Sequence, residues 1–400
     1  MPTGATRQWW LISEIFGSRL PLLDYSRNNQ SVHRRLFQLA ASLAGYLRSL
    51  TSPQAAIMGD GVSWGRGFIH IVPRLQFTQL AKELVRGRPV IFLPADNVGC
   101  ALEKFNFDRD APLSSLLNGN ECLTVSGCRS GQPVFAHIGS ASAGRSSVYR
   151  HAQGLSDARA ALLETALLRN MAEPIEQFDR GNVSIFMQTL LGGRRVVPSD
   201  DRFFKLLDKT TNTVQQLHAA TVDFGACPES ELLSKMRSDL SLIEDKNVIR
   251  LTEGMIEEIE EWINLRKPPA VRVHGDFSMA NLLFDENDNV TAIVDWEWTR
   301  AKGCAGFDAI HVAISAVAEH ERNDFASVAS KLIVGGGSPR ILKYLDRTLP
   351  KLDMDGSDIP SLAKLYWLNL IFRGGVWTKP PNNRWWPKIT ESIFALKGAR

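Results

Sequence analysis

A short polar block in the C-terminal half of the chain combines two carboxylates with a side-chain amide. It reads HGDFSMAN at residues 274–281 and is followed by IVDW at residues 293–296. Asn281 offers an amide oxygen and Asp295 a carboxylate, and such hard oxygen ligands suit Mg²⁺ while the ion also binds phosphate oxygens. The second carboxylate, Asp276, is left to accept a proton from a hydroxyl group. A base beside a metal site predicts transfer of a phosphoryl group to an alcohol.

The elements around this block must bring residues that are distant in the sequence together. The pattern predicts a strand before the polar loop, a short strand at 282–284, a turn at 286–289 and a second strand that ends at Asp295. Two short strands joined by a turn of Glu, Asn and Asp residues form a hairpin. The hairpin is expected to return Asp295 to the side of Asn281.

The two segments HGDFSMANLL and IVDWEW resemble the aminoglycoside phosphotransferase and choline kinase-like family, which shares the protein-kinase fold. The spacing from Asp276 to Asn281 is also that of the kinase catalytic loop. The resemblance implies that Asp276 is the catalytic base and that Asn281 and Asp295 bind Mg²⁺. It further implies that ATP is the phosphoryl donor and that His274 and Asp308 brace the loop.

Weaker features resemble the same family in the expected order. FMQT at residues 186–189 is similar to the hinge strand that contacts adenine, which assigns Gln188 to the nucleotide site. QLHA at residues 216–219 is similar to the helix that precedes the catalytic loop. The pattern Gly-x-Asp-x-x-His, which ends at His311, is most like relatives associated with sugars and polysaccharides.

The N-terminal strand PVFAHIG departs from the family pattern. His137 stands where the family carries a Lys that binds the α- and β-phosphates, and Glu164 on a predicted helix at 156–171 is its expected partner. A histidine beside a carboxylate and a polyphosphate could hold a proton and bind phosphate. An ordinary strand histidine is the alternative, with Arg129, Arg145 or Arg150 replacing the Lys.

Two other interpretations compete with an active kinase. GSASAGRS at residues 139–146 nearly matches a P-loop, although Arg replaces the Lys and the element order does not indicate a parallel sheet. A non-catalytic nucleotide-binding protein, a pseudokinase acting as a regulator or scaffold, is favoured by His137. Retention of Asp276 and both metal ligands argues against it, since a binding module does not need a base.

Composition and charge limit the remaining classes of protein and partner. The 400 residues are 44% hydrophobic and 22% charged, which is typical of a soluble globular protein, and no apolar run is long enough to span a membrane. The net charge of +3 is too small to indicate nucleic-acid binding. Residues 1–90 carry 11 Lys and Arg against 4 Asp and Glu, so this basic segment could touch an anionic membrane surface, a solvated face being the alternative. Five cysteines without a CxxC pair favour a reducing cytoplasm.

The sequence therefore predicts a two-lobed, protein-kinase-like α+β fold. Residues 1–87 are expected to be an N-terminal extension, 88–190 a strand-rich nucleotide-binding lobe, and 191–400 a helical lobe for catalysis and acceptor binding. The expected reaction moves the γ-phosphoryl group of ATP, with Mg²⁺, to a hydroxyl of a small molecule, a sugar or glycan precursor being one candidate. The identity of the acceptor lies beyond what the sequence indicates.

Overall fold

The structure is a computed structural model that describes most of the chain from residue 122 to residue 373. Within that range, residues 182, 197–201, 243–245 and 322–324 are not described. Before residue 122, the structure describes residues 106–107 and four strands. The chain divides into two compact units. The first comprises Met1–Gln153 and Ala172–Leu190, and the second comprises Gly154–Met171 and Leu191–Arg400. None of the described helices is long and apolar enough to cross a membrane.

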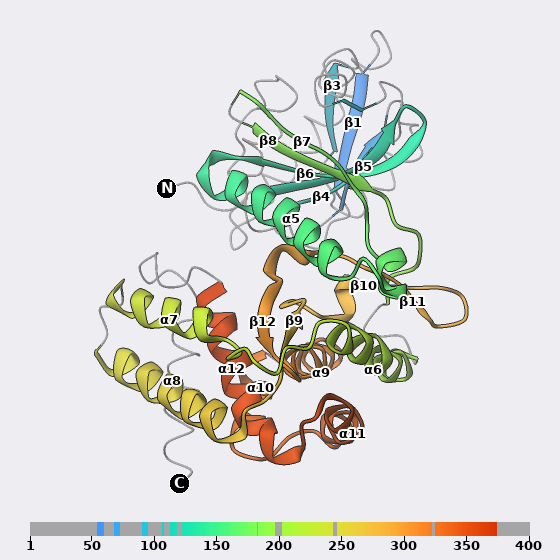
Figure 1. The fold of residues 1–400 in the computed structure, drawn as a ribbon. Coiled ribbons are helices and arrows are strands. Elements are labelled where there is room, and N and C mark those ends of the chain that lie inside the picture. Colours follow the sequence, from blue (N-terminus) through green and yellow to red (C-terminus); the bar gives the residue numbers. More distant parts are fainter. Residues whose placement is uncertain are drawn as a thin grey trace, which may run out of the picture. The chain divides into compact units, whose positions relative to one another are not determined.

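The first unit contains an antiparallel sheet of eight strands in the order β3-β1-β2-β4-β5-β6-β8-β7. Figure 1 shows β5 and β6, in teal, as neighbours within this sheet. The strands are β1 (Gln54–Gly59), β2 (Phe68–Val72), β3 (Val90–Pro94), β4 (Leu113–Leu117), β5 (Cys122–Arg129), β6 (Gln132–Ser140), β7 (Pro174–Arg180) and β8 (Val183–Thr189).

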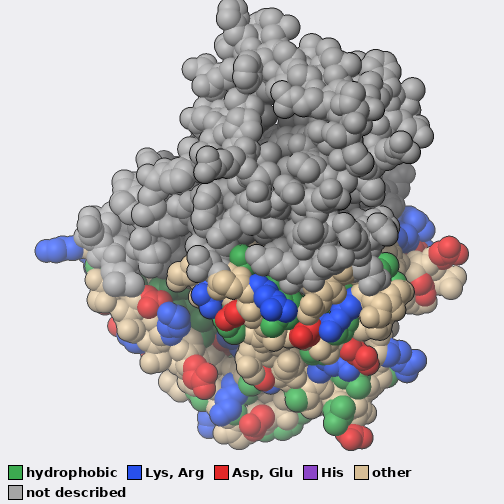
Figure 2. Space-filling model, turned by 90° about the horizontal axis from the view of Figure 1, so that it is seen from above, with side chains coloured by type: hydrophobic (Ala, Val, Ile, Leu, Met, Phe, Trp, Pro, Cys, Tyr) green, Lys and Arg blue, Asp and Glu red, His purple; other side chains and the backbone are tan. Residues whose placement is uncertain are grey.

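Strands β1 and β2 come from the segment at 1–87 that the sequence set apart as an extension. In the sheet, β1 pairs with β3 and β2 pairs with β4, so strands from both sides of residue 88 share one ladder of hydrogen bonds. The rest of the basic segment lies outside the described residues. On the described surface in Figure 2, Lys and Arg side chains are interspersed with Asp and Glu.

The hairpin of β5 and β6 is tighter than the sequence predicted. The sequence at 121–138 predicts a hairpin with SGCRSG as its turn, whereas the strands continue to Arg129 and resume at Gln132, which pair with each other. Ser130 and Gly131 form the turn, and both have positive φ, 51° and 75°. Two residues with positive φ match the right-handed twist of the flanking strands, which explains why two residues suffice.

Strand β6 passes directly into helix α5 (Ala141–Ala161), with no loop between them. The helix begins well before the predicted range of 156–171 and ends before its last residues, so that prediction of the bounds was wrong. The junction is close-packed, since a Cβ on Gly139 would lie 2.1 Å from the carbonyl oxygen of Gly144. An antiparallel sheet whose strand runs straight into a helix also excludes the P-loop alternative.

The second unit is mostly helical. Helix α9 lies at its centre, where it contacts α6, α10, α11 and α12, and its residues from Phe307 to Ala318 are buried. The helices are α6 (Phe203–Ala219), α7 (Ser230–Asp239), α8 (Lys246–Arg266), α9 (Phe307–His320), α10 (Phe325–Ile333), α11 (Pro339–Thr348) and α12 (Ile359–Arg373). The sequence predicts helices at 203–221 and 252–265, and these correspond to α6 and to most of α8.

Two small antiparallel sheets complete the second unit, and their strands flank the polar block. One pairs β10 (Leu282–Phe284) with β11 (Val290–Ile293), and the other pairs β9 (Ala270–Val273) with β12 (Arg300–Cys304). Short 3₁₀ helices lie at η1 (Ala166–Asn170), η2 (Leu240–Leu242), η3 (Met279–Asn281), η4 (Trp296–Trp298), η5 (Leu349–Leu352) and η6 (Gly356–Asp358).

A buried ion pair ties β12 to the start of α7. Glu229, which is 2% exposed, accepts two hydrogen bonds of 2.9 Å from the Arg300 guanidinium and one of 3.0 Å from the backbone N–H of Cys304. Arg300 also donates to the side chain of Asn369 on α12, at 3.3 Å. Three segments that are distant in the sequence therefore meet around the Arg300 side chain.

We expect Glu229→Gln to lower the free energy of unfolding by about 3 kcal/mol or more, because it leaves the largely buried Arg300 charge uncompensated. Urea denaturation of the full chain measures the change. Glu231→Gln, at an exposed position on α7, is the matched control and should shift the free energy by about 0.5 kcal/mol or less. Equal values for the two variants would contradict a structural role for the ion pair.

Candidate functional site

The hairpin of β10 and β11 places Asn281 beside the residue that precedes Asp295. Leu282 pairs with Ile293, and one step further the backbone N–H of Val294 donates to the carbonyl oxygen of Asn281 at 3.0 Å. The predicted pairing of this hairpin is confirmed. Backbone hydrogen bonds thereby hold Asn281 and Asp295 at neighbouring positions of the hairpin.

Asp295 adopts a backbone conformation that residues with a side chain rarely take. Its φ is 68° and its ψ is 60°, in the left-handed region, and the 3₁₀ helix η4 begins at the next residue. Trp296 anchors this turn because its buried indole N–H donates to the carbonyl oxygen of Ile293 at 3.0 Å. A strained backbone conformation that costs about 1–3 kcal/mol persists only where the surroundings impose it, and such positions cluster at functional sites.

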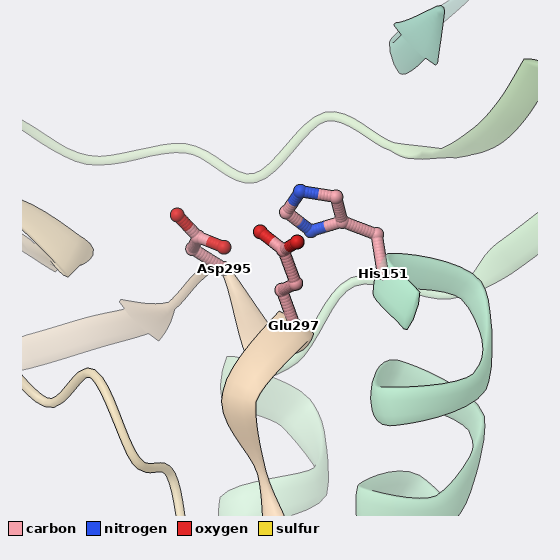
Figure 3. Close-up of side chains that lie close together, drawn as sticks. All are labelled: His151, Asp295 and Glu297. Atoms are coloured by element: carbon pink, nitrogen blue, oxygen red, sulfur yellow. The ribbon is translucent and has the colours of Figure 1, made fainter. Parts of the chain in front are cut away.

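Glu297 brings a second carboxylate to the same turn. Figure 3 shows the Asp295 and Glu297 side chains projecting from one short stretch of chain. An oxygen of each lies within 4.8 Å of the other, and Glu297 is buried. Two carboxylates beside the Asn281 amide form an oxygen-rich set that fits Mg²⁺ better than a softer metal.

His274 connects the loop that carries Asp276 to the end of the hairpin. Its Nε2 lies 2.9 Å from the carbonyl oxygen of Val294, and its Nδ1 lies 3.2 Å from the backbone N–H of Asp276. A carbonyl only accepts and an N–H only donates, so the proton is on Nε2. Burial lowers the pKa of His274, more strongly than the nearby carboxylates Asp308 and Asp276 raise it, which agrees with a neutral ring.

Asp308 holds the backbone of the same loop from the first turn of α9. Its carboxylate accepts hydrogen bonds from the backbone N–H groups of His274 and Gly275, at 2.8 and 3.0 Å. Burial alone would raise the pKa of Asp308, yet it is lowered because His218 and the His274 contacts favour the charged form. His218 Nε2 lies 3.9 Å away, which is too long for a hydrogen bond but close enough for electrostatic attraction.

Glycine is the residue type that fits position 275 of the loop. Its φ is +80°, and a Cβ there would lie 2.1 Å from the carbonyl oxygen of Trp298. Both the backbone conformation and the lack of space therefore require glycine. The loop can approach the turn after Asp295 only because residue 275 has no side chain.

Asp276 has two further contacts and keeps 29% of its side chain exposed. Its carbonyl oxygen accepts a hydrogen bond of 2.9 Å from the Asn281 side-chain amide, so the amide oxygen of Asn281 is the atom that could bind a metal. Its carboxylate oxygen Oδ1 lies 3.1 Å from Nε2 of His311 on α9. In the sequence, His311 is distinguished only as the end of the Gly-x-Asp-x-x-His pattern, and its contact with Asp276 was not predicted. Its spacing of three residues from Asp308 could have placed both on one helix face.

The predicted nucleotide-site residues His137 and Gln188 lie on adjacent strands of the first unit, β6 and β8, and both are buried. The His137 ring stacks on the ring of His151, with centroids 3.8 Å apart and planes at 23°. Burial first, and then the positive charge of Arg150, lower the pKa of His151 to about 3, so this ring is neutral at physiological pH. His137 is therefore packed against an uncharged aromatic surface.

Three other residues that the sequence linked to the missing Lys have defined places. Glu164 is exposed in the turn at 162–165 after α5, so the prediction that it lies on a helix was wrong. Two of the arginines that were proposed to replace the Lys form ion pairs with carboxylates on β7. Arg129 lies 2.7 Å from Glu176, and Arg145 lies 3.1 Å from Asp179.

Comparison with known proteins agrees with this geometry. Residues 184–314, which include β8, the loop of Asp276 and most of α9, match the model of the phosphotransferase enzyme family. The predicted family resemblance is confirmed. The enzyme class that it implied, a phosphotransferase, is confirmed with it. No curated protein matches the chain.

Solved structures of phosphotransferases have the same fold. A thermostable mutant of the aminoglycoside phosphotransferase APH(4)-Ia, in complex with ADP and hygromycin B, is 13% identical with a TM-score of 0.52 and covers 75% of this chain and 96% of its own. Another mutant of that enzyme, with AMP-PNP and hygromycin B, is 14% identical with a TM-score of 0.50 and covers 75% and 96%. The predicted protein-kinase-like α+β fold class is confirmed.

We expect Gly275→Ala to lower the free energy of unfolding by about 2 kcal/mol or more, because the new methyl group meets the Trp298 carbonyl. Gly335→Ala is the matched control. Its φ of +79° is almost the same, but a Cβ there meets nothing within 4 Å. The control should therefore cost only the backbone term, about 1 kcal/mol. Urea denaturation compares them, and equal losses would contradict the predicted clash.

Proposed function

We propose that the protein transfers the γ-phosphoryl group of ATP to a hydroxyl group of a small molecule. The observation that carries the proposal is the convergence of Asp276, Asn281 and Asp295 within the segment that matches the phosphotransferase family. Phosphoryl transfer depends mainly on positioning and on stabilisation of charge, and a rigid loop with a base beside an oxygen-ligand set supplies both.

Asp276 is the proposed catalytic base. Its carboxylate would orient the acceptor hydroxyl and take its proton as the acceptor oxygen bonds to the γ-phosphorus. The bond between the γ-phosphorus and the oxygen bridging to the β-phosphate breaks, and ADP leaves with that oxygen. His274 and Asp308 would act on the loop backbone and keep the carboxylate in place. The partial exposure of Asp276 allows an acceptor to reach it.

Asn281 and Asp295 are the proposed ligands of Mg²⁺, with Glu297 as a further oxygen donor of the same turn. Their oxygen atoms and the negative charge of the two carboxylates fit a hard divalent cation. When bound, Mg²⁺ supplies neutralisation of the charge on the phosphate oxygens. The residues themselves contribute fixed positions, since the backbone pairing of the hairpin and the left-handed turn set where each oxygen lies.

His137 and Gln188 are the proposed nucleotide contacts of the first unit. Support comes from the resemblance of β8 to a hinge strand and from neighbours that were solved with ADP or AMP-PNP. The stacked environment of His137 gives it less freedom than a lysine would have. The pseudokinase alternative gains no support from a match to an enzyme family.

The proposed acceptor is a sugar or a glycan precursor. The pattern Gly-x-Asp-x-x-His that ends at His311 supports it, and two neighbours contain hygromycin B. A screen of ATP turnover with sugars, aminoglycosides and choline, with Mg²⁺ present, tests the acceptor class. Stimulation by choline alone would overturn the sugar proposal while leaving the phosphotransferase reaction in place.

We expect Asp276→Asn to reduce turnover by at least about 10²-fold, the usual contribution of a positioned base, while ATP affinity stays nearly unchanged. Steady-state kinetics and a binding titration with ATP and Mg²⁺ measure the two effects. Asp346→Asn, at an exposed position on α11, is the control and should match the unmodified protein. Turnover within a few-fold of normal would remove Asp276 from the base role.

Asp295→Ala should abolish the Mg²⁺-dependent stabilisation of the protein by ATP, because a neutral Asn281 amide cannot offset the charge of the metal. Thermal unfolding with ATP, recorded with and without Mg²⁺, detects the loss. Glu286→Ala, exposed in the turn of the same hairpin, is the control and should keep the full Mg²⁺-dependent shift. An equal shift in both variants would show that the metal ligands lie elsewhere.

A further inference from the structure

Helix α9 contacts the loop of Asp276 at two points that differ in kind. Asp308, in the first turn, accepts hydrogen bonds from the loop backbone. His311, one turn later, approaches the loop side chain itself, with Nε2 3.1 Å from Oδ1 of Asp276. The first contact positions the chain, and the second bears directly on the group proposed to do the chemistry.

The imidazole of His311 is fixed by its surroundings. Its side chain is 5% exposed, and Tyr366 on α12 meets it edge-on with ring centroids 5.0 Å apart. Phe307 on the same helix meets it nearly at right angles, at 84°. A side chain enclosed in this way cannot change rotamer without repacking its neighbours. His311 therefore offers its Nε2 at one place in space.

We propose that His311 is a positioning residue that sets the orientation of the catalytic carboxylate. An ionised carboxylate only accepts hydrogen bonds, so Nε2 carries the hydrogen and donates it to Oδ1. Fixing Oδ1 fixes the carboxylate plane, and so decides where Oδ2 meets the acceptor hydroxyl. In the reaction the acceptor proton goes to Asp276, and His311 keeps its own. This inference rests on the proposed function.

The partners of the ring favour this role over simple filling of the core. Nε2 is engaged by Asp276, whereas the buried Nδ1 has no hydrogen-bond partner within the described part of the chain. An apolar residue would fill the same space without that unpaired atom. Asp276, in turn, lies on a loop and keeps 29% of its side chain exposed, so contact with a buried, fixed ring restricts the rotamer of its carboxylate. Small errors in such placement cost up to about 10²-fold in rate.

Kinetics of the full chain test the inference, with MgATP hydrolysis, in which water is the acceptor, as the probe. We expect His311→Leu to lower kcat by about 10-fold or more, with the KM for MgATP unchanged within about 2-fold. His311→Gln, whose amide can donate from nearly the same place, should restore kcat to within about 3-fold of normal. His320→Leu, at the other end of α9 and packed on Phe203 and Phe204, is the control and should change neither constant.

A merely structural role predicts equal losses for His311→Leu and His311→Gln, or a loss shared by His320→Leu, and either result overturns the proposal. So does a kcat for His311→Leu within about 2-fold of normal. NMR supplies a readout that needs no turnover. In protein with ¹⁵N-labelled histidine, His311 should give a slowly exchanging Nε2–H signal that disappears in Asp276→Ala. A signal that is absent, or that survives in Asp276→Ala, overturns the contact.

The two experiments also separate failure of this inference from failure of the proposed function. If the unmodified protein binds no MgATP and hydrolyses none, the proposed function fails, and the catalytic role of His311 fails with it. If the unmodified protein turns over MgATP and His311→Leu does so equally well, the proposed function stands and only the positioning role is lost.

Discussion

The carboxylate of Asp308 is the constraint on which the loop of Asp276 depends. It lies at the N-terminal end of the central helix α9, and its two hydrogen bonds go to the backbone of His274 and Gly275 rather than to side chains. Burial of an ionised group is costly unless it is fully paired. The same contacts that satisfy Asp308 therefore fix the path of the chain, and a displaced loop would leave a buried charge without partners.

The rest of the site is built outward from that fixed path. His274 links the loop to the hairpin strand, and the Asn281 amide links the hairpin back to the Asp276 carbonyl. The His274 ring is fully buried, so the contact that satisfies its Nε2 also sets the geometry of the loop. Substitutions that disturb the loop should consequently affect folding as well as chemistry.

The sequence was most informative where local chemistry decides the structure. The hairpin before Asp295 and the helix α6 follow from turn residues and apolar periodicity, which act over a few residues. The start of α5 was not predicted because GSASAGRSS has the composition of a loop. Packing decides it instead, through the close approach at Gly139 and the bonds of Arg145 to Ser184 and Asp179. The contact of His311 with Asp276 joins distant segments, so only the folded chain reveals it.

The left-handed backbone at Asp295 narrows the choice of residue there for two independent reasons. The proposed role as a metal ligand requires a carboxylate, which aspartate and glutamate both provide. A positive φ is tolerated mainly by glycine, asparagine and aspartate, whose short polar side chain can bond locally. Aspartate alone satisfies both demands. A glutamate at this position would keep the charge and still be disfavoured by the main chain, so the restriction on sequence here is stricter than the chemistry of the metal by itself would impose.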